Sequence, residues 1–458
     1  MKNFINEDKI FDILERTEKP SRQNAETIIS KSLRLKGLSP DDAAVLLNCE
    51  DDVLLNSIYT AANQIKDLIY GNRLVLFAPL YLSNRCINNC LYCGFRQQDL
   101  ETGKRLLNSD EIREETNALI SQGHKRLLLV SAEDPEVNID YLEEAINTVY
   151  NTKEGNGSIR RVNVNVAPMG VRDFKRLKNT GIGTYQLFQE TYHRDTYSQI
   201  HTSGPKVDYV KRLYACDLAQ SAGIDDVGIG ALFGLYNYKF EVLALLFHAI
   251  HLERTFGVGP HTISVPRLEP AQGSNIAAHP PCPVSDNELK KIIAVLRLAV
   301  PYTGIILSTR ENAFLRDELF HLGVSQISAG SRTNPGSYSG NGKSQGQFVI
   351  ADERSLAEVI EDLADRGFIP SFCTSCYRTG RTGEDFMDLA KPGDIKNFCQ
   401  PNALLTFEEY LLDYNPKLAQ KIKPFISFEI NKIPDNKVRQ KTMNYIKSLI
   451  KGERDLYF

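Results

Sequence analysis

The stretch LVLFAPLYLSNRCINNCLYCGF (residues 74–95) joins an apolar run directly to a loop that carries three cysteines. The run covers residues 74–82 and has the composition and length expected of a buried strand. Cys86, Cys90 and Cys93 follow it with the spacing CxxxCxxC. The stretch therefore predicts a strand that presents a cysteine loop at its carboxyl end.

Outward from this strand, the chain repeats one arrangement in which a strand is followed by a helix. Short apolar or alternating runs alternate with amphipathic segments, a pattern typical of successive βα units. The predicted strands are 74–82, 126–132, 161–167, 183–189, 226–232, 261–266, 304–308 and 324–329. The helices predicted between them are 109–123, 139–151, 171–179, 206–222, 240–256, 286–300 and 312–321. Eight such units fit a closed (β/α)8 barrel of the TIM type, although strand number alone leaves an open doubly wound sheet possible.

Two further regions flank the predicted barrel. Near the N-terminus, a cap-like Ser39-Pro40-Asp41 precedes apolar residues at helical spacing, which predicts a helical extension. The glycine- and serine-rich segment 334–347 predicts a boundary or a mobile loop. We therefore expect a helical N-terminal extension, a barrel and a mainly helical C-terminal module, over residues 1–70, 71–340 and 341–458.

Composition narrows the class of protein. The 458 residues are 42% hydrophobic and 24% charged, with a net charge of -3, so the sequence predicts a globular protein without a nucleic-acid partner. The N-terminus is charged from residue 2 and lacks the apolar core of a secretion signal, and no stretch has the length of a membrane span. We therefore expect a cytoplasmic protein that does not contact a membrane. Nine cysteines without an export signal favour metal ligands and buried thiols over disulfides.

The loop with Cys86, Cys90 and Cys93 has the spacing of an iron-sulfur site. Its predicted place is the C-terminal face of the barrel, where barrel enzymes build their active sites. Three thiolates on the four irons of a cubane leave one iron without a protein ligand. The alternatives are a zinc site or three buried thiols. Zinc prefers four ligands, and the loop holds no fourth cysteine or histidine, so the spacing favours a [4Fe-4S] cluster with one open iron.

This loop resembles the signature of the radical S-adenosylmethionine (SAM) superfamily. The resemblance implies that the open iron binds S-adenosylmethionine through the amino and carboxylate groups of its methionine portion. One electron then cleaves the cofactor and releases a 5'-deoxyadenosyl radical. Cys86, Cys90 and Cys93 are thereby implied as both metal ligands and catalytic residues.

Weaker marks of the same superfamily suggest four contacts to the cofactor. Tyr92 is expected to pack against the adenine. Glu133 would lie near the methionine amino group, although only the glutamate remains of the usual Gly-Gly-Glu-like turn. Gly230 would let the backbone approach the adenine, but a strand glycine is as often required for packing. Glu190 could meet the ribose or the methionine amine, or it could be an ordinary solvated glutamate.

A second set of three cysteines lies near the end of the chain. Cys373 and Cys376 form a CxxC pair, and Cys399 follows after 22 residues. A CxxC pair alone is compatible with zinc, redox chemistry or chance. However, the run CTSCYRTGRTGEDFMDLAKPGDIKNFCQ (373–400), with GPHTISVPRLEPA (259–271) upstream, resembles the family of tyrosine lyases that mature [FeFe]-hydrogenase. The resemblance extends over nearly the whole chain.

That family resemblance implies a specific reaction. L-tyrosine is cleaved between Cα and Cβ into p-cresol and dehydroglycine, and the latter becomes carbon monoxide and cyanide at an auxiliary [4Fe-4S] cluster. This cluster carries an extra iron with a cysteine ligand, and the product is an Fe(CO)2(CN) synthon for the hydrogenase cofactor. The ligands implied for the auxiliary cluster are Cys373, Cys376 and Cys399. The implied partners are L-tyrosine, a reduced electron donor such as ferredoxin or flavodoxin, and downstream hydrogenase maturation proteins.

Three further residues are candidates for metal or substrate binding. By family likeness His261 binds the extra iron, although a solitary histidine is more often structural. Arg310 and Arg332 each follow a late strand, and a guanidinium can clamp the carboxylate of an amino acid through two parallel hydrogen bonds. A salt bridge between barrel loops is the alternative, with Glu311 as an available partner. The remaining cysteines match no motif and are expected to be packing thiols: Cys49, Cys216 and Cys282.

Two other functions remain open at this point. The tyrosine lyase of thiazole synthesis shares the radical loop, but it has no counterpart of the C-terminal cysteine set. A non-catalytic carrier of iron-sulfur units is the second alternative. The C-terminal cysteines favour the maturase.

Overall fold

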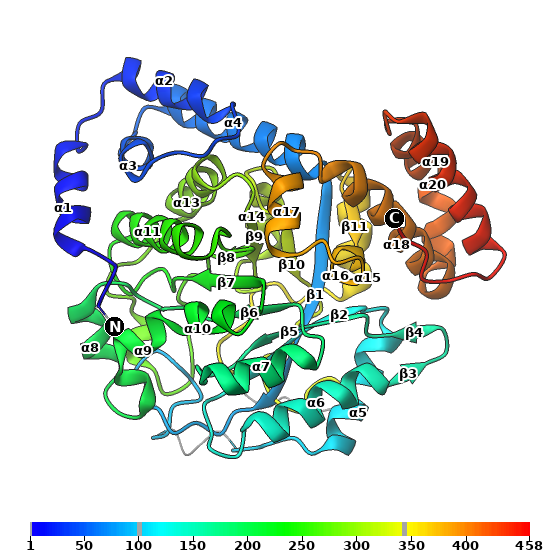
Figure 1. Cartoon of the computed structure of the whole chain (residues 1–458), viewed down its shortest axis with the longest axis horizontal. Coiled ribbons are helices and arrows are strands. Elements are labelled where there is room, and N and C mark those ends of the chain that lie inside the picture. The colour runs from blue at the N-terminus through cyan, green and yellow to red at the C-terminus, as the bar shows by residue number, and fades with distance from the viewer. Residues whose placement is uncertain (1, 99–102, 341–345) are drawn as a thin grey trace.

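Eight parallel strands form a closed barrel at the centre of the molecule (Figure 1). The computed structural model describes residues 2–98, 103–340 and 346–458. The barrel strands are β1 (Arg73–Ser83), β2 (Arg126–Ser131), β5 (Arg161–Asn165), β6 (Thr184–Gln186), β7 (Asp226–Gly230), β8 (Thr262–Ser264), β9 (Gly304–Leu307) and β10 (Gln326–Ser328). Strand β10 pairs with β1 through Gln326 and Val75, which closes the barrel. The predicted (β/α)8 barrel is confirmed, and the open sheet is excluded.

The helices that follow the strands cover the outside of the barrel. They are α5 (Ser109–Ser121), α6 (Ile139–Asn151), α7 (Val171–Asn179), α9 (Tyr209–Leu213), α10 (Ala215–Ser221), α11 (Tyr238–Phe256), α13 (Asp286–Ala299) and α14 (Ala313–Phe320). Shorter elements lie in the loops: the hairpin β3 (Lys153–Glu154) and β4 (Gly157–Ser158), α8 (Arg194–Ile200), η1 (Pro205–Val207) and α12 (Asn275–Ala278). The single helix predicted over 206–222 is instead divided into η1, α9 and α10.

The N-terminal extension is helical, as the sequence predicts. It consists of α1 (Glu7–Arg16), α2 (Arg22–Ser32), α3 (Pro40–Leu47) and α4 (Asp52–Tyr70). Ser39 caps α3, since its Oγ accepts a hydrogen bond from the amide of Asp42 and its own amide donates one to the Asp42 carboxylate. Helix α3 then packs against α11 and α13. The extension therefore covers one side of the barrel rather than forming a separate body.

The C-terminal region is mainly helical but also extends the barrel sheet. Its elements are α15 (Leu356–Asp365), β11 (Ile369–Ser371), α16 (Ser375–Arg378), α17 (Gly383–Ala390), α18 (Lys396–Tyr414), α19 (Pro416–Asn431) and α20 (Asn436–Ile450). The sequence did not predict β11, which pairs in parallel with the first residues of β1, Arg73 to Val75. The predicted boundary at residue 341 falls on residues 341–345, outside the described ranges.

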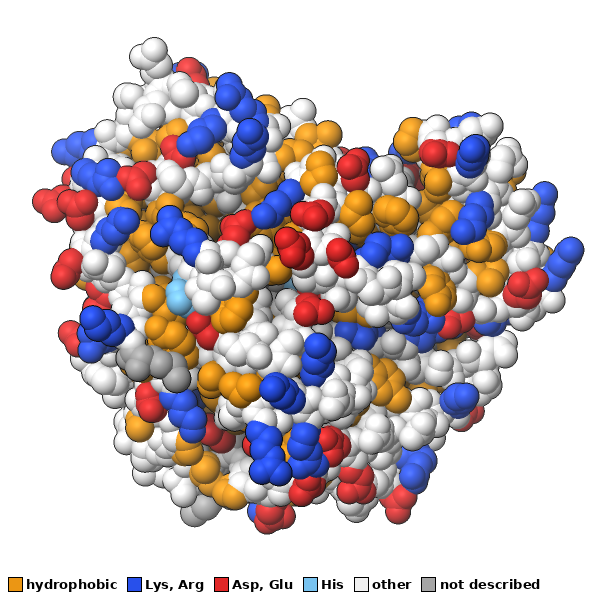
Figure 2. All heavy atoms as spheres, viewed as in Figure 1, with side chains coloured by type: hydrophobic (Ala, Val, Ile, Leu, Met, Phe, Trp, Pro, Cys, Tyr) orange, Lys and Arg blue, Asp and Glu red, His pale blue; other side chains and the backbone are white. Residues whose placement is uncertain are grey.

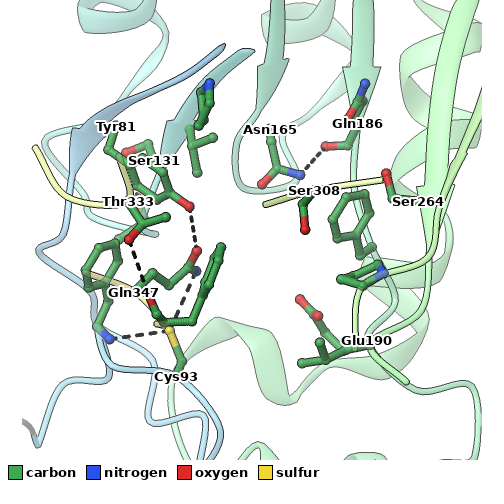
Figure 3. Close-up of a pocket in the computed structure, with 18 of the residues that line it drawn as sticks. Tyr81, Cys93, Ser131, Asn165, Gln186, Glu190, Ser264, Ser308, Thr333 and Gln347 are labelled. Carbon is green, nitrogen blue, oxygen red and sulfur yellow. Dashed lines mark hydrogen bonds between the residues drawn. The ribbon is translucent and has the colours of Figure 1, made fainter. Parts of the chain in front are cut away.

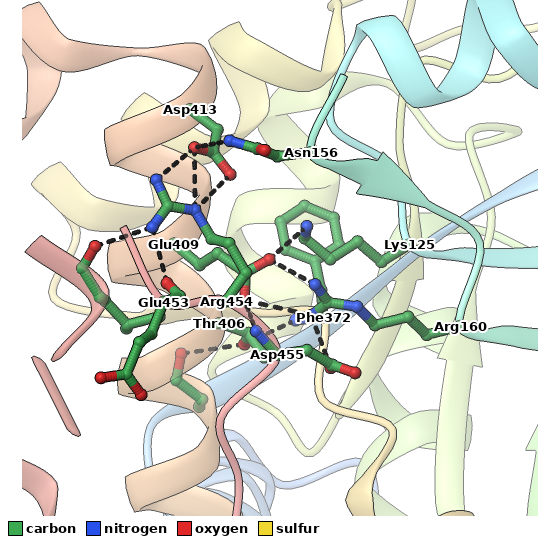
Figure 4. A network of polar contacts seen from close by, with 12 residues as sticks. Lys125, Asn156, Arg160, Phe372, Thr406, Glu409, Asp413, Glu453, Arg454 and Asp455 are labelled. Atoms are coloured by element: carbon green, nitrogen blue, oxygen red, sulfur yellow. Dashed lines mark hydrogen bonds and ion pairs between the residues drawn. The ribbon is translucent and has the colours of Figure 1, made fainter. Parts of the chain in front are cut away.

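A buried ion network attaches α18 to the barrel (Figure 4). Glu409 accepts from Lys125 Nζ at 2.8 Å and from Arg160 Nη1 at 3.1 Å, and the side chains of Glu409 and Lys125 are almost fully buried. Burial alone would raise the pKa of Glu409, but Arg160 and Lys125 outweigh it and lower this pKa to about 2. Arg160 also pairs with Asp455 at 3.1 Å, so the network holds α18 and the segment after α20 to the same barrel end.

The distribution of charged side chains on the surface agrees with the small net charge of the sequence. Figure 2 shows Lys and Arg side chains interspersed with Asp and Glu over the face viewed. Among the helices in the described ranges, none is both long and apolar enough to span a membrane.

Candidate functional site

A cavity opens at the C-terminal mouth of the barrel (Figure 3). Residues of seven barrel strands contribute to its wall, together with Leu232, which follows β7, and the loop that follows β1. Cys86, Cys90 and Cys93 from that loop all line the cavity. The structure therefore gathers the first cysteine set at the mouth where the sequence predicts it.

Backbone contacts shape the cysteine loop from both sides. The amide of Ile87 donates to the carbonyl of Glu133 at 2.9 Å, and the amide of Leu91 donates to Ile200 at 2.9 Å. Within the loop, the amide of Asn88 donates to Cys86 Sγ at 3.4 Å, and the amide of Phe95 donates to Cys93 Sγ at 3.4 Å. Donors aimed at sulfur suit thiolates rather than inert packing thiols, because hydrogen bonds to sulfur stabilise the negative charge of a cluster.

Cys90 is buried, whereas Cys86 and Cys93 are partly buried. Burial raises the pKa of Cys90 to about 12 and also raises the pKa of Cys93. A metal must therefore displace the protons of these thiols when it binds. No three His, Cys, Asp or Glu side chains of the described residues converge as ligands of a single ion would. A cubane places each thiolate on a different iron, so its ligands do not need to converge on one point.

Tyr92 forms part of the cavity wall and is fixed at its hydroxyl. Its Oη lies 3.0 Å from Nε2 of His201, and both side chains are buried. Burial lowers the pKa of His201 to about 2, so this imidazole is neutral. Lys206 Nζ lies 5.4 Å from the centroid of the Tyr92 ring. The ring is thereby held against one side of the cavity.

Glu190 is buried in an ion-paired cluster and is not a solvated glutamate. Its carboxylate contacts Lys206 Nζ at 2.7 Å and Arg212 Nη2 at 3.2 Å. Burial would raise the pKa of Glu190, but these two cations outweigh it and lower the pKa. The backbone of Glu190 has φ of 73°, a left-handed conformation that is unusual for a residue with a side chain. Strain of this kind is commonly found at functional sites.

Glu133 and Gly230 also lie at this mouth. Glu133 Oε2 accepts from the side-chain amide of Asn88 at 2.7 Å, so it contacts the cysteine loop as well as the cavity. A Cβ at Gly230 would lie 2.7 Å from the ring of Phe188 and 2.9 Å from the carbonyl of Ser264. Close packing between neighbouring strands is therefore sufficient to require this glycine.

The two candidate arginines have different positions. Arg310 lines the cavity and stacks on Phe348, with its guanidinium carbon 3.4 Å from the ring centroid. Glu311 pairs with Arg267 instead of Arg310. Arg332 is exposed and is absent from the described cavity lining, although its neighbours Ser331 and Thr333 belong to it. The structure therefore brings only Arg310 to the mouth of the cavity.

Sequence reasoning missed several polar residues of this cavity. Inward-facing positions on the strands carry amides and hydroxyls: Asn165, Gln186, Ser264 and Ser308. Sequence reasoning also did not identify the partners of Glu190, Lys206 and Arg212, because they lie in a helical stretch without a motif. Strict alternation along the strands is the signal that would have identified the inward-facing set.

A second cavity lies at the N-terminal mouth of the barrel. Cys373, Cys376 and Cys399 line it together with His261. Residues at or near the starts of barrel strands supply another part of its wall: Arg73, Arg126, Asp226, Gly304 and Gln326. The C-terminal region adds Thr374, Ser375, Tyr377 and Phe386. The structure thus brings the second cysteine set together with His261, which the family resemblance associates with this set.

Buried donors surround this second set. Nitrogens of Arg73, Arg126 and His261 are buried without a hydrogen-bond partner among the described residues. His261 Nδ1 lies 3.6 Å from Asp226 Oδ1, which is too long for a hydrogen bond. Burial raises the pKa of Cys376 to about 12 and also raises the pKa of Cys399. Buried arginine nitrogens without an acceptor, beside three thiols, fit an anionic group bound between them.

Cys49, Cys216 and Cys282 line neither cavity. Cys49 and Cys216 belong to the hydrophobic core, whereas Cys282 is partly exposed.

The comparisons with known proteins agree with this architecture. The radical SAM superfamily matches residues 80–247, and the Biotin and Thiamin Synthesis associated domain matches residues 264–369. A crystal structure of HydG, a maturase of the [FeFe]-hydrogenase, is 52% identical over the full length of both chains, with a TM-score of 0.97. The HydG structure from Carboxydothermus hydrogenoformans is 42% identical, covers 96% of this chain and 97% of that one, and has a TM-score of 0.83.

A more distant relative is the 2-iminoacetate synthase of Salmonella typhimurium. It is 31% identical over 344 residues, which are 75% of this chain and 89% of that protein. Membership of the superfamily brings with it a [4Fe-4S] cluster and S-adenosylmethionine. By its full-length likeness, the chain is a radical SAM enzyme that belongs to the family of the HydG maturases.

Proposed function

We propose that this chain is a tyrosine lyase, which cleaves L-tyrosine into p-cresol and dehydroglycine and converts the latter into carbon monoxide and cyanide. The product is an Fe(CO)2(CN) synthon for the hydrogenase cofactor. The observation that carries the proposal is the position of two cysteine sets at opposite mouths of one barrel. Proposed partners are a reduced donor such as ferredoxin or flavodoxin and downstream hydrogenase maturation proteins.

The first mouth is suited to hold the cofactor. Cys86, Cys90 and Cys93 would hold a [4Fe-4S] cluster, which would supply the 5'-deoxyadenosyl radical from S-adenosylmethionine. Tyr92 offers an aromatic wall that its hydrogen bond to His201 prevents from turning. Glu190 is held by two cations, which makes it a fixed acceptor for a ribose hydroxyl or an amine.

Arg310 is the proposed clamp for the tyrosine carboxylate. Burial lowers the pKa of Arg310, so an anion that pairs with it relieves an unfavourable burial of charge. Stacking on Phe348 fixes the plane of the guanidinium, and Nη1 donates to the carbonyl of Arg267 at 3.4 Å. The edge formed by Nε and Nη2 is left for two parallel hydrogen bonds. Such a clamp orients the amino group of the substrate inside the cavity.

A small polar fragment would have to cross the interior of the barrel to pass from the first mouth to the second. From Val75 in the second cavity to Tyr81 in the first, β1 advances about 20 Å. Between the mouths, the wall carries polar side chains, among them Asn165, whose amide donates to the carbonyl of Gln186 at 3.0 Å (Figure 3).

The second mouth is suited to an auxiliary cluster. Cys373, Cys376 and Cys399 are its proposed cluster ligands, and His261 is the proposed ligand of the extra iron. Arg73 and Arg126 balance the negative charge of such a group with buried donors.

One reaction tests the proposed function. Anaerobically reconstituted protein, supplied with reductant, S-adenosylmethionine and L-tyrosine, is expected to release 5'-deoxyadenosine, p-cresol, carbon monoxide and cyanide. A non-catalytic carrier would release none of them. Release of p-cresol without carbon monoxide would instead support the thiazole-type lyase, whose curated relative leaves a quarter of this chain unmatched.

A further inference from the structure

Gln347 contacts the first cysteine loop although it belongs to the connector after the eighth barrel strand. Its side-chain nitrogen lies 3.8 Å from Cys93 Sγ and donates to it. Its side-chain oxygen accepts from the hydroxyl of Tyr81 at 2.9 Å. Its backbone carbonyl accepts from the amide of Gly94 at 3.3 Å, and its amide donates to the carbonyl of Thr333 at 3.0 Å. Figure 3 shows Gln347 among these side chains.

Two glycines allow this close approach. A Cβ at Gly94 would lie 3.0 Å from the carbonyl oxygen of Gln347 and 3.2 Å from that of Gly346. A Cβ at Gly346 would overlap the hydroxyl of Thr333. At Gly94 the neighbouring atoms are backbone oxygens, which cannot move aside easily, and at Gly346 the side chain of Thr333 would have to turn away. Glycine at both positions therefore lets the connector lie against the loop. Both the connector and the cysteine loop therefore contain a glycine that allows the contact of Gln347 with Cys93.

A hydrogen bond to a ligand sulfur directly changes the reduction potential of the cluster. The cluster gains one electron from an external donor, without forming or breaking a bond, and its negative charge grows. An N–H donor at a ligand sulfur stabilises the more negative state, so it raises the reduction potential. Gln347 adds such a side-chain donor to the backbone donor that Cys93 receives from Phe95.

We propose that Gln347 is a positioning residue that raises the reduction potential of the radical SAM cluster through its contact with Cys93. The inference rests on the proposed role of Cys93 as a cluster ligand. The proposal gives a role in the electron-transfer step to a residue of the connector, which lies outside the barrel strands.

Two substitutions separate the donor from the shape of the side chain. Gln347→Leu removes both polar groups at similar size. Gln347→Glu keeps the acceptor for Tyr81 but replaces the donor with a negative charge. The matched control is Val349→Ala, on the same connector, because Val349 is 56% exposed and its amide contact to Pro270 involves only backbone.

The measurement is a redox titration of the full-length reconstituted protein, followed by the EPR signal that changes when S-adenosylmethionine is added. At a fixed potential, the ratio of reduced to oxidised cluster is expected to be about threefold to tenfold lower in both Gln347 variants. A tenfold change in this ratio corresponds to 59 mV for one electron. The shift should be larger for glutamate than for leucine, and Val349→Ala should match the wild type.

Two results would overturn the inference alone: potentials unchanged in both Gln347 variants, or an equal shift in Val349→Ala. A wild type without any signal that responds to S-adenosylmethionine would overturn the assignment of Cys93, and the inference with it. The two failures are therefore distinguishable.

Discussion

The two mouths of the barrel hold their cysteines in different ways. At the C-terminal mouth, Cys86, Cys90 and Cys93 lie in one loop, and neighbouring backbone fixes that loop. At the N-terminal mouth, Cys373 follows β11, Cys376 lies on α16 and Cys399 lies on α18. The first set depends on one loop and on the barrel segments that contact it, whereas the second set also needs the tertiary packing of the C-terminal helices. Damage to the C-terminal packing should therefore affect the two sites unequally.

The largest expected effect follows from removing a ligand of the first set. Cys86→Ala leaves two thiolates, so the variant should release no detectable 5'-deoxyadenosine above background. Chromatography of the quenched reaction measures this product. Retained release of 5'-deoxyadenosine would show that the first cysteine set is not the radical site.

The next effect separates the two mouths. Replacing both Cys376 and Cys399 with serine should leave p-cresol formation within about twofold of wild type while stopping the release of carbon monoxide, because the radical site keeps all its ligands. Carbon monoxide is measured by its binding to a haem protein. If both products disappear together, the second set serves the fold instead of a separate reaction.

A smaller effect is expected at the wall of the first mouth. Arg310→Gln should raise the KM for tyrosine about tenfold to hundredfold, because loss of a charge-assisted pair costs roughly 1.5–3 kcal/mol. Arg332→Gln is the matched control, since this side chain is exposed and outside the described cavity lining. Initial rates of p-cresol formation give both constants. Equal effects in the two variants would contradict the assignment of the clamp to Arg310.

The smallest effect on radical chemistry is expected from a substitution in the buried ion network at α18. Glu409→Gln leaves Lys125 and Arg160 without their carboxylate, so the free energy of unfolding should fall by about 3 kcal/mol. Alkylation of Cys399 in the metal-free protein should accelerate, whereas alkylation of Cys90 should not. Glu408→Gln, on the same helix, is the control. Equal acceleration at both cysteines would contradict the unequal dependence of the two mouths on C-terminal packing.

The same network has a defined pH dependence. Glu409 has a folded pKa of about 2, below its unfolded value of about 4.3. Its stabilising contribution is therefore fully present above pH 4.3 and is lost as the pH falls from there towards 2. Denaturation curves across this range should converge for wild type and Glu409→Gln.

The sequence could predict the barrel because each strand carries its own periodic signal. All eight predicted strands occur, and most are shorter than predicted because their ends turn into the two mouths. Strand β11 was not predictable, since three residues with a central Pro370 carry little strand signal. Its pairing with β1 depends on tertiary contact alone.

The candidate site was predictable only where spacing encodes it. The first cysteine set could be placed at the C-terminal mouth because its three members lie at short intervals in one loop directly after a strand. The choice between Arg310 and Arg332 could not be made, because both follow strands and only the fold shows which one lines the cavity. Glu190 and Gln347 likewise acquire their partners from distant segments, Lys206 with Arg212 and Cys93 with Tyr81.

Strand β1 connects both mouths, which has a consequence for the order of assembly. Its carboxyl end leads into the first cysteine loop, and its first residues receive β11, which comes nearly three hundred positions later. Contacts of such high sequence separation form late in folding, since the entropy of closing the intervening chain must be overcome first. During synthesis, the segment with the first loop also leaves the ribosome long before β11 exists. The first loop, whose contacts extend only as far as Gln347, can therefore be in place before the second pocket, which becomes available only when the whole chain has closed around β1.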